Sequence, residues 1–286
     1  MKLCRFRLAD GAPRVGLRSR RGDMVIDLSA VGIERLDALL EARNPVRTLQ
    51  RLNIRRLPRH DLSAVTLLAP VDEQEVWAVG VTYLRSKAAR MDESDFSATA
   101  YDRVYDARRP ELFFKALPHK VVGTGDAVGI RRDARWSVPE PELVLVLNAR
   151  GALVGYAAGN DMSSRDIEGE NLLYLPQAKI YNRSCAVGPW IVVGATEATA
   201  RRWSISISIT RGGRDVFTGS TRVSRIKRSF AELRRYLLRS QDFPHGAMLF
   251  TGTGIVPADD FTLRRGDVVT ISISGIGTLS NPVVVV

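Results

Sequence analysis

Apolar and polar residues alternate at every second position in many short stretches of the chain, which is the pattern of half-buried β-strands. Three such stretches lie near the N-terminal end: Leu3–Leu8, Val15–Ser19 and Met24–Leu28. An amphipathic helix is predicted near Ile33–Arg43, and Pro70 follows a short apolar run. The pattern therefore predicts a small α/β domain over residues 1–70 and a second domain over residues 71–286.

The second domain is predicted to consist mainly of strands. Val76–Val81 is a short apolar run bounded by polar residues, and isoleucine alternates with serine after Trp203. Helices are predicted over Arg85–Arg109 and after Ser229, which forms a capping box with Glu232. Because strands and helices do not alternate regularly, the predicted fold class is mixed α/β, mainly β, and neither a Rossmann fold nor a TIM barrel.

A β-hairpin is predicted at the centre of the chain. Leu143–Leu147 and Ala152–Ala158 have the composition of strands, and Asn148–Gly151 between them is a turn sequence. Glu140 and Glu142 precede the first apolar run. Since residues two positions apart in a strand point to the same face, these two carboxylates are expected to project together.

A third carboxylate is predicted to join them. Counting back from the turn places residue 159 opposite Glu140, so Asp161 lies just past the end of the return strand, near both glutamates. Carboxylates that converge repel each other unless a cation neutralises them, and oxygen ligands suit Mg²⁺, Mn²⁺ or Ca²⁺. The alternative interpretation is a group of surface carboxylates on a solvent-facing strand.

Two further features favour a site over a charged surface. Asp161 lies in the dense polar stretch Gly159–Asp166, directly after an apolar strand, where functional sites are often built. Lys179 follows this stretch in a chain whose basic residues are mostly arginine. A buried lysine titrates readily and serves as an acid, a base or a charge partner, so Lys179 is a candidate active-site residue.

Composition and charge exclude several classes of protein. The three histidines lie far apart, and Cys4 and Cys185 form no CxxC motif, which argues against a zinc site, a Ser-His-Asp hydrolase and a disulfide framework. No apolar run has the length of a membrane span, and the first residues do not form a secretory signal. We therefore expect a cytoplasmic protein with reduced thiols and no membrane partner.

The net charge of +11 permits nucleic-acid binding, which is the alternative of another class: a basic binding protein without catalysis. However, the arginines are spread over the chain, and their densest groups alternate with apolar residues at helix-like spacing. No aromatic-rich binding motif accompanies them. We therefore expect a small-molecule partner and no nucleic acid.

A series of motifs runs from about Val76 to the C-terminal end. The motifs are Val79-Gly80-Val81-Thr82-Tyr83, Phe113-Phe114-Lys115, Glu140-x-Glu142-Leu143, Asn160–Asp166, Lys179, Gly188-Pro189-Trp190, Thr251-Gly252-Thr253-Gly254 and Leu263-x-x-Gly266-Asp267. Each motif alone is weak, but their joint order and spacing resemble the fumarylacetoacetate hydrolase superfamily. The resemblance implies a β-roll catalytic core, a homodimer or homotetramer, and a 2-oxo acid substrate chelated by a metal ion.

The resemblance also implies roles for individual residues. The metal ligands of the family map onto Glu140, Glu142 and Asp161, its active-site lysine maps onto Lys179, and the threonine that binds the substrate carboxylate maps onto Thr253. Members of the family carry out C–C hydrolysis, decarboxylation, isomerisation or dehydration.

One departure from the family pattern reduces the number of reactions that the resemblance implies. Many hydrolytic members have N-Y-x-x-H in the cap region, where a histidine and a nearby glutamate activate water. Here the stretch is Thr82–Lys87, and Ser86 stands in place of the histidine. The segment from Ser163 to Lys179 is similar to one branch, the 2-dehydro-3-deoxy-D-arabinonate dehydratases. This branch implies metal-dependent dehydration of a 2-keto-3-deoxy sugar acid to 2,5-dioxopentanoate, with an enolate stabilised by the cation.

Roles in such a reaction can be assigned as hypotheses. Lys179 is the first choice for proton transfer near the metal, and Glu111 is the candidate acid that assists departure of hydroxide. Tyr83, Arg85 and Ser86 are expected to line the cap side, where Arg85 pairs with the substrate carboxylate. The alternative within the same superfamily is an acylpyruvate-type C–C hydrolase or an oxaloacetate decarboxylase.

Overall fold

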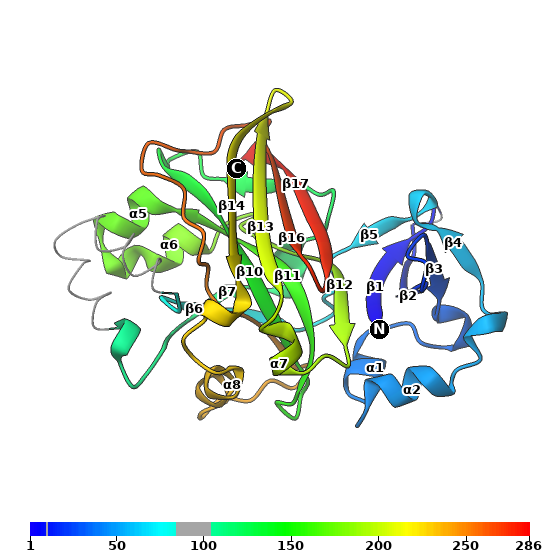
Figure 1. Ribbon diagram of the computed structural model, residues 1–286. Coiled ribbons are helices and arrows are strands. Elements are labelled where there is room, and N and C mark those ends of the chain that lie inside the picture. Colours follow the sequence, from blue (N-terminus) through cyan, green and yellow to red (C-terminus); the bar gives the residue numbers. More distant parts are fainter. Residues whose placement is uncertain (10, 84–103) are drawn as a thin grey trace.

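Two β-sheets form the framework of the protein in the computed structural model, which describes residues 1–9, 11–83 and 104–286 (Figure 1). The strands of the large sheet are β1 Lys2–Arg7, β2 Pro13–Arg18, β3 Met24–Asp27, β4 Arg59–Asp61, β5 Thr66–Leu68, β6 Glu75–Gly80, β7 Glu111–Ala116, β8 Val121–Val122, β10 Ser137–Leu147, β11 Leu153–Ser164, β12 Cys185–Val193 and β15 Ala247–Phe250. Their order is β4-β3-β2-β1-β12-β11-β10-β15-β6-β7, with β5 beside β1 and β8 beside β12.

The second sheet has the order β14-β13-β16-β17-β9. Its strands are β9 Val128–Ile130, β13 Ser204–Arg211, β14 Arg214–Arg222, β16 Val268–Ile273 and β17 Gly277–Val285. The α-helices of the described residues include α1 Asp37–Leu40, α2 Pro45–Arg51, α5 Arg165–Glu170, α6 Leu175–Lys179, α7 Glu197–Ala200 and α8 Phe230–Leu237. The mixed, mainly β fold class predicted from the sequence is confirmed.

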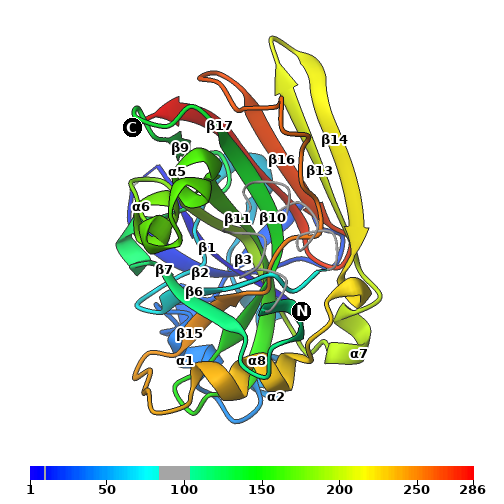
Figure 2. The ribbon, with the colours of Figure 1, turned by 90° about the vertical axis from the view of Figure 1, so that its left-hand side faces the viewer.

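The main core lies between the second sheet and the hairpin β10–β11. In Figure 1 the strands β13, β14, β16 and β17 run in front of β10 and β11, and Figure 2 shows the same sheet from its side. Ile205, Ile207 and Ile209 point inward from β13 and are buried in one cluster with Leu143 and Leu145 of β10. The predicted alternation of isoleucine and serine therefore gives a strand with one buried face, as expected.

The N-terminal strands are part of the large sheet. β1 pairs with β2 on one side and with β12 on the other, so Leu3 is the partner of both Leu17 and Ile191. These three side chains are buried in one apolar cluster. The predicted boundary between two domains near residue 70 stays a prediction. Backbone hydrogen bonds of the large sheet connect β1, before this boundary, to β12, after it.

The helix predicted near Ile33–Arg43 is wrong in its extent. The structure has only the single turn α1 there, and the longer helix α2 begins after Asn44. The Asn44 side chain accepts a hydrogen bond of 3.0 Å from the backbone N–H of Arg47, and Pro45 occupies the first turn. Asparagine at the N-cap and proline at the first position start a helix, and proline disfavours helical geometry in the residue before it.

The predicted helix over Arg85–Arg109 lies largely outside the described residues, which omit 84–103. The helix after Ser229 is confirmed, because the Ser229 hydroxyl accepts a hydrogen bond of 3.1 Å from the backbone N–H of Glu232. No helix among the described residues is both long enough and apolar enough to cross a membrane.

Candidate metal centre and active site

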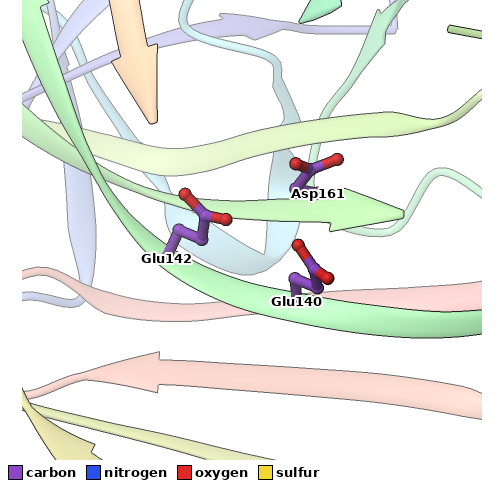
Figure 3. A group of neighbouring side chains, drawn as sticks. All are labelled: Glu140, Glu142 and Asp161. Carbon is purple, nitrogen blue, oxygen red and sulfur yellow. The ribbon is translucent and has the colours of Figure 1, made fainter. Parts of the chain in front are cut away.

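The hairpin β10–β11 brings the three predicted carboxylates together. Glu140 pairs with Asp161 and Glu142 pairs with Gly159 across the two strands. Figure 3 shows the three side chains on the same side of the hairpin. The predicted register, with residue 159 opposite Glu140, is wrong by two residues, and Asp161 lies inside the strand instead of beyond its end. Leu147 pairs with Leu153, which moves the register by one residue, and the shift between Val146 and Leu147 moves it by one more; the sequence pattern indicates neither.

The three carboxyl groups are buried and close to one another. Glu140 is 4% exposed and Glu142 and Asp161 are each 1% exposed. One oxygen from each residue lies within 4.8 Å of the others. The alternative interpretation, surface carboxylates on a solvent-facing strand, is therefore wrong.

Two cationic side chains contact this triad. The Lys179 ammonium, at the end of α6, donates hydrogen bonds to Glu140 Oε2 at 2.8 Å, Asp161 Oδ2 at 3.3 Å and Ser163 Oγ at 2.6 Å. Arg165, the first residue of α5, donates from Nη2 to Glu140 Oε1 at 2.7 Å. Both side chains are almost completely buried, so these charged groups compensate one another away from water.

A third cation, Lys115, lies behind the triad and is fully buried on β7. Its ammonium is 2.5 Å from Asp161 Oδ1, on the carboxylate oxygen opposite the one that Lys179 contacts. The same nitrogen donates to the carbonyl oxygens of Met162 at 3.0 Å and Lys179 at 2.5 Å. One ammonium therefore connects a carboxylate of the triad to the backbone of the neighbouring lysine.

Glu142 has a different environment from its two neighbours. Its Oε2 accepts a 2.6 Å hydrogen bond from the backbone N–H of Gly252, in the loop that follows β15. Burial raises the pKa of Glu142 well above its ordinary value, and the negative charges of Asp161 and Glu140 raise it further. Gly252 has a φ of +85°, and a Cβ there would meet Thr82 Oγ1 at 2.2 Å, so glycine is required for this approach.

The donor set fits a divalent cation with oxygen ligands. An octahedral ion bound at about 2.1 Å holds its ligand oxygens between about 3 and 4 Å apart, which is close to the spacing of the triad. Burial raises the pKa of Glu142, and repulsion from Asp161 and Glu140 raises it further. A cation held by Glu140, Glu142 and Asp161 would offset this repulsion.

A pocket opens from the triad, and two other predicted residues line it. Glu111, the first residue of β7, and Thr253, in the loop after β15, are both part of its wall. Glu111 lies against Gly80, where an added Cβ would be 1.8 Å from Glu111 Oε2. The Thr253 hydroxyl donates to the carbonyl oxygen of Ile255 at 3.3 Å. The structure therefore brings the candidate acid, the candidate lysine and the predicted metal ligands to one pocket.

Tyr83 does not line this pocket among the described residues. Its ring is buried in the main core beside Gly254, where an added Cβ would be 2.4 Å from Tyr83 Cδ1. Burial raises the pKa of the Tyr83 hydroxyl, and the negative charge of Glu142 raises it further. Arg85 and Ser86, the other two residues predicted on the cap side, lie outside the described residues.

Sequence reasoning assigned no role to several residues of the site: Lys115, Arg165, Glu168 and Gly252. Glu168 is 2% exposed and lines the pocket from α5. Lys115 and Arg165 each lie inside one of the family motifs, and this position is the sequence feature that could have identified them as site residues. Their function became visible only when the structure showed which carboxylate each side chain contacts.

Several known proteins are similar to this chain. The probable 2-keto-3-deoxyxylonate dehydratase of Haloferax volcanii is 50% identical over 217 residues, which cover 76% of this chain and 74% of that protein. The 2-dehydro-3-deoxy-D-arabinonate dehydratase of Saccharolobus solfataricus is 42% identical over 230 residues, or 79% and 77% of the two chains. The solved structure of 2-keto-3-deoxy-D-arabinonate dehydratase complexed with magnesium and 2,5-dioxopentanoate has a TM-score of 0.83 and 34% identity, and covers 100% of this chain and 99% of that one.

The matched family model is described as fumarylacetoacetate (FAA) hydrolase C-terminal and spans residues 75–284. This range contains both sheets' central strands, the triad and all the described residues that line the pocket. The chain belongs to the fumarylacetoacetate hydrolase family.

Proposed function

We propose that the protein removes water from a 2-keto-3-deoxypentonate and releases 2,5-dioxopentanoate, with Mg²⁺ held by Glu140, Glu142 and Asp161. The observation that carries this proposal is the buried triad that lines a pocket, in a chain that is 50% identical over 217 residues to a probable 2-keto-3-deoxyxylonate dehydratase. The names of the two similar dehydratases describe five-carbon acids whose only stereocentre is C4. We therefore treat them as one substrate class.

The substrate itself explains why a metal and two proton-transfer groups suffice. A C3 proton is acidic because it lies next to the C2 ketone, and the C4 hydroxyl lies one carbon further, in position to leave. After water departs, C3 and C4 each regain a proton while C5 and its hydroxyl each lose one, which gives the aldehyde. When bound, a divalent cation supplies the positive charge that polarises the ketone.

We assign proton transfer at C3 to Lys179. Its ammonium already lies 2.8 Å from Glu140 Oε2 and 2.6 Å from Ser163 Oγ, so it is held at the triad where the reacting carbons would sit. The Ser163 hydroxyl accepts a hydrogen bond from the Lys179 ammonium and orients this side chain, and the Lys115 ammonium donates to the Lys179 carbonyl oxygen and holds its backbone. The assignment requires C3 of the bound substrate to lie within hydrogen-bond reach of this nitrogen.

We assign proton donation to the departing C4 hydroxyl to Glu111. Its carboxyl group lies over Gly80 and shares the pocket with the triad. A carboxylic acid there would return a proton to the oxygen that leaves, so that water and not hydroxide departs. Thr253 lines the same pocket and is assigned to the carboxylate of the substrate.

Two further proposals concern the whole protein. Cys4 and Cys185 are buried free thiols, which supports the expectation of a reducing compartment such as the cytoplasm. Assembly into a homodimer or homotetramer stays a prediction, and a mass of two or four times 31.6 kDa by light scattering would support it.

The direct test is turnover. The protein is incubated with Mg²⁺ and 2-keto-3-deoxy-D-arabinonate. Formation of 2,5-dioxopentanoate is measured before and after removal of metal with a chelator. We expect activity that disappears with the chelator and returns with Mg²⁺. No turnover of this acid, together with good turnover of an acylpyruvate or of oxaloacetate, would reject the dehydratase assignment in favour of a hydrolase or decarboxylase.

The metal assignment is tested separately. Glu142→Gln removes a ligand charge, whereas Glu170→Gln makes the same change at an exposed position of α5. We expect Glu142→Gln to weaken Mg²⁺ binding by more than about tenfold, and Glu170→Gln to leave it unchanged. Full Mg²⁺ affinity in Glu142→Gln would contradict the assignment.

A further inference from the structure

A groove lined by arginines lies in the N-terminal part of the chain, apart from the pocket at the triad. It has a volume of about 540 Å³ and lies between the turn that joins β2 to β3, the short helical turn Ile54–Arg56 and the first residue of β4. In Figure 1, β3 and β4 lie at the opposite end of the molecule from α5 and α6. We call it the arginine groove, after the four arginines that line it: Arg20, Arg21, Arg55 and Arg59.

The turn that carries Arg20 and Arg21 is held by its own hydrogen bonds. The backbone N–H of Ser19 donates to the carbonyl oxygen of Met24 at 2.9 Å. The Ser19 hydroxyl accepts a hydrogen bond of 3.1 Å from the backbone N–H of Gly22, whose φ of +87° suits glycine. The two arginine side chains therefore extend from a backbone that is already ordered.

The other side of the arginine groove is attached to the same sheet. Arg59 is directly opposite Ile26 in the pairing of β4 with β3, so the two side chains lie on one face. Arg55 lies three residues before Pro58, whose carbonyl oxygen accepts a hydrogen bond of 2.9 Å from the backbone N–H of Asp27. Because both sides are fixed by the sheet, a ligand would need to order side chains but little backbone.

The four guanidinium groups of the arginine groove have no protein partner. Within residues 1–9, 11–83 and 104–286, none of them takes part in a hydrogen bond or an ion pair. By contrast, the Arg14 guanidinium, on the neighbouring strand β2, is 3.0 Å from Asp27 Oδ2. The described residues that line the groove include one carboxyl group, Asp23, which accepts a hydrogen bond of 3.0 Å from the Ser19 hydroxyl. Four positive charges against one negative charge in a small space attract an anion.

Part of the wall of the arginine groove is apolar. Met24, Ile26 and Ile54 line it beside the arginines. Ile26 is 4% exposed and belongs to the apolar cluster of Leu3 and Leu17, and Ile54 packs against the same cluster. An inorganic anion would contact the arginines and leave this apolar surface open to water. A ligand that joins an anionic chain to a flat ring system would cover both parts of the wall.

The size of the groove favours a small molecule over a macromolecule. Pockets for small molecules have volumes of about 300–1,000 Å³, and the arginine groove lies within this range. Single-stranded nucleic acids are usually bound on extended basic surfaces where bases stack on aromatic side chains. None of the described residues that line this groove is aromatic. Phosphate oxygens are the anionic groups that the forked guanidinium binds through two hydrogen bonds.

We propose that the arginine groove binds a nucleoside triphosphate, with the phosphate chain on the four arginines and the base against Met24, Ile26 and Ile54. The chain of three phosphates presents charged oxygens in a row, so that several guanidinium groups each find a partner. The described residues that line the groove are all different from those that line the pocket at the triad. The proposal therefore does not depend on the proposed function, and a failed dehydratase assay would leave it standing.

Three probes separate the charged part of the ligand from its ring system. ATP, inorganic triphosphate and adenosine are titrated into the protein by calorimetry at constant ionic strength, with a chelator present so that ATP carries no metal. We expect ATP to bind with a dissociation constant below about 100 μM. Inorganic triphosphate should bind at least about tenfold more weakly than ATP, and adenosine more weakly than either.

Two double variants with the same loss of charge isolate the groove. Arg55→Ala with Arg59→Ala removes two of its guanidinium groups, whereas Arg214→Ala with Arg222→Ala removes two exposed ones from β14. We expect the first variant to raise the dissociation constant of ATP by at least about thirtyfold, and the second by less than about twofold. A melting curve of each variant verifies that it folds.

The possible results either support this proposal or overturn it. No binding of ATP, or equal dissociation constants in the two double variants, would overturn the arginine groove as its site. Inorganic triphosphate that binds as tightly as ATP would overturn the role of the apolar wall, and with it the nucleoside part of the ligand. A single-stranded RNA that binds more tightly than ATP and is lost in the Arg55 and Arg59 variant would overturn the small-molecule assignment in favour of nucleic acid.

Discussion

At the scale of single residues, Glu142 is the carboxylate of the triad that the protein compensates least. Lys179 and Arg165 contact Glu140, and Lys115 and Lys179 contact Asp161. Glu142 accepts its hydrogen bond from the uncharged backbone N–H of Gly252. The raised pKa of Glu142 follows from burial and from the charges of Asp161 and Glu140.

This raised pKa sets the pH dependence of metal binding. The folded, metal-free protein keeps a proton on Glu142 at a pH where the unfolded chain has lost it. The contribution of Glu142 to stability therefore falls as the pH rises from about 4.5 through the raised pKa. A cation must displace this proton, so we expect Mg²⁺ affinity to rise as the pH is raised above about 4.5, with proton release.

Calorimetry in two buffers of different protonation enthalpy measures the protons released. Glu142→Gln should abolish the part of the release that belongs to this residue. Mg²⁺ affinity that is independent of pH over the same range would contradict the role given to Glu142.

Lys115 offers a second test at this scale, because all its contacts are buried. Lys115→Met removes the ammonium but keeps an unbranched side chain, and leaves Asp161 Oδ1 and two backbone carbonyls without their donor. We expect a loss of about 3–5 kcal/mol in the free energy of unfolding, measured with urea on metal-free protein. Lys120→Met, at an exposed position, should change it by less than about 0.5 kcal/mol. Equal stability of the two variants would argue against this role for Lys115.

These residues also show what a sequence can reveal about a site. Glu140 and Glu142 are two positions apart, so their common face follows from strand geometry alone. Lys115 is 46 positions from Asp161, and their contact depends on how β7 is placed relative to β11. No local pattern encodes that distance, so the sequence predicted the carboxylates and not the cation behind them.

At the scale of elements, the same contrast appears between strands. Strands with regular alternation, such as β13, were predicted within a residue or two of their ends. β12 is buried along its whole length and was not predicted, because a strand covered on both faces has no polar side to mark its period. The hairpin β10–β11 was predicted, but its register was wrong by two residues: one because Leu147 pairs with Leu153 and not with Ala152, and one because the pairing shifts between Val146 and Leu147.

The pairing of β6 with β7 places Glu111 opposite Gly80, and it suggests a test of the candidate acid. In Gly80→Ala the new methyl group would occupy the position of the Glu111 carboxyl group and displace it. We expect kcat to fall by about 10²-fold or more, as it should in Glu111→Gln. The double variant should be little worse than either single variant, because both changes remove the same group.

Steady-state kinetics of the three variants measures this coupling, and melting curves show whether each one folds. Additive losses in kcat would mean that Gly80 acts independently of Glu111. Full activity in Glu111→Gln would remove this residue from the mechanism.

At the scale of the whole molecule, the N-terminal strands and the catalytic part share one sheet. β12 pairs with β11, the strand that carries Asp161, on one side and with β1 on the other. Leu3 and Leu17 lie in the same apolar cluster as Ile191 and Val187 of β12. The predicted division near residue 70 is thus crossed by both backbone pairing and side-chain packing.

We therefore expect residues 1–70 and 71–286 to unfold together. Removing residues 1–70 would expose the edge of β12 and apolar side chains that β1 covers. We expect residues 71–286 alone to aggregate, or to unfold at a clearly lower temperature and without Mg²⁺-dependent activity, in a scanning calorimetry comparison with the full chain. An unchanged melting temperature and full activity would show that the catalytic part is independent.

The pairing of β10 with β11 has a consequence for how this protein tolerates changes in length. Glu140 and Asp161 face each other because the count of residues through the intervening turn is fixed. One residue inserted in β10 between Glu142 and the turn would rotate both glutamates to the opposite face of the strand, although every ligand would still be present. Among homologous proteins that keep the metal site, deletions and insertions between the two strands should therefore be rarer than substitutions there. The site depends on the number of residues between its ligands as much as on the ligands themselves.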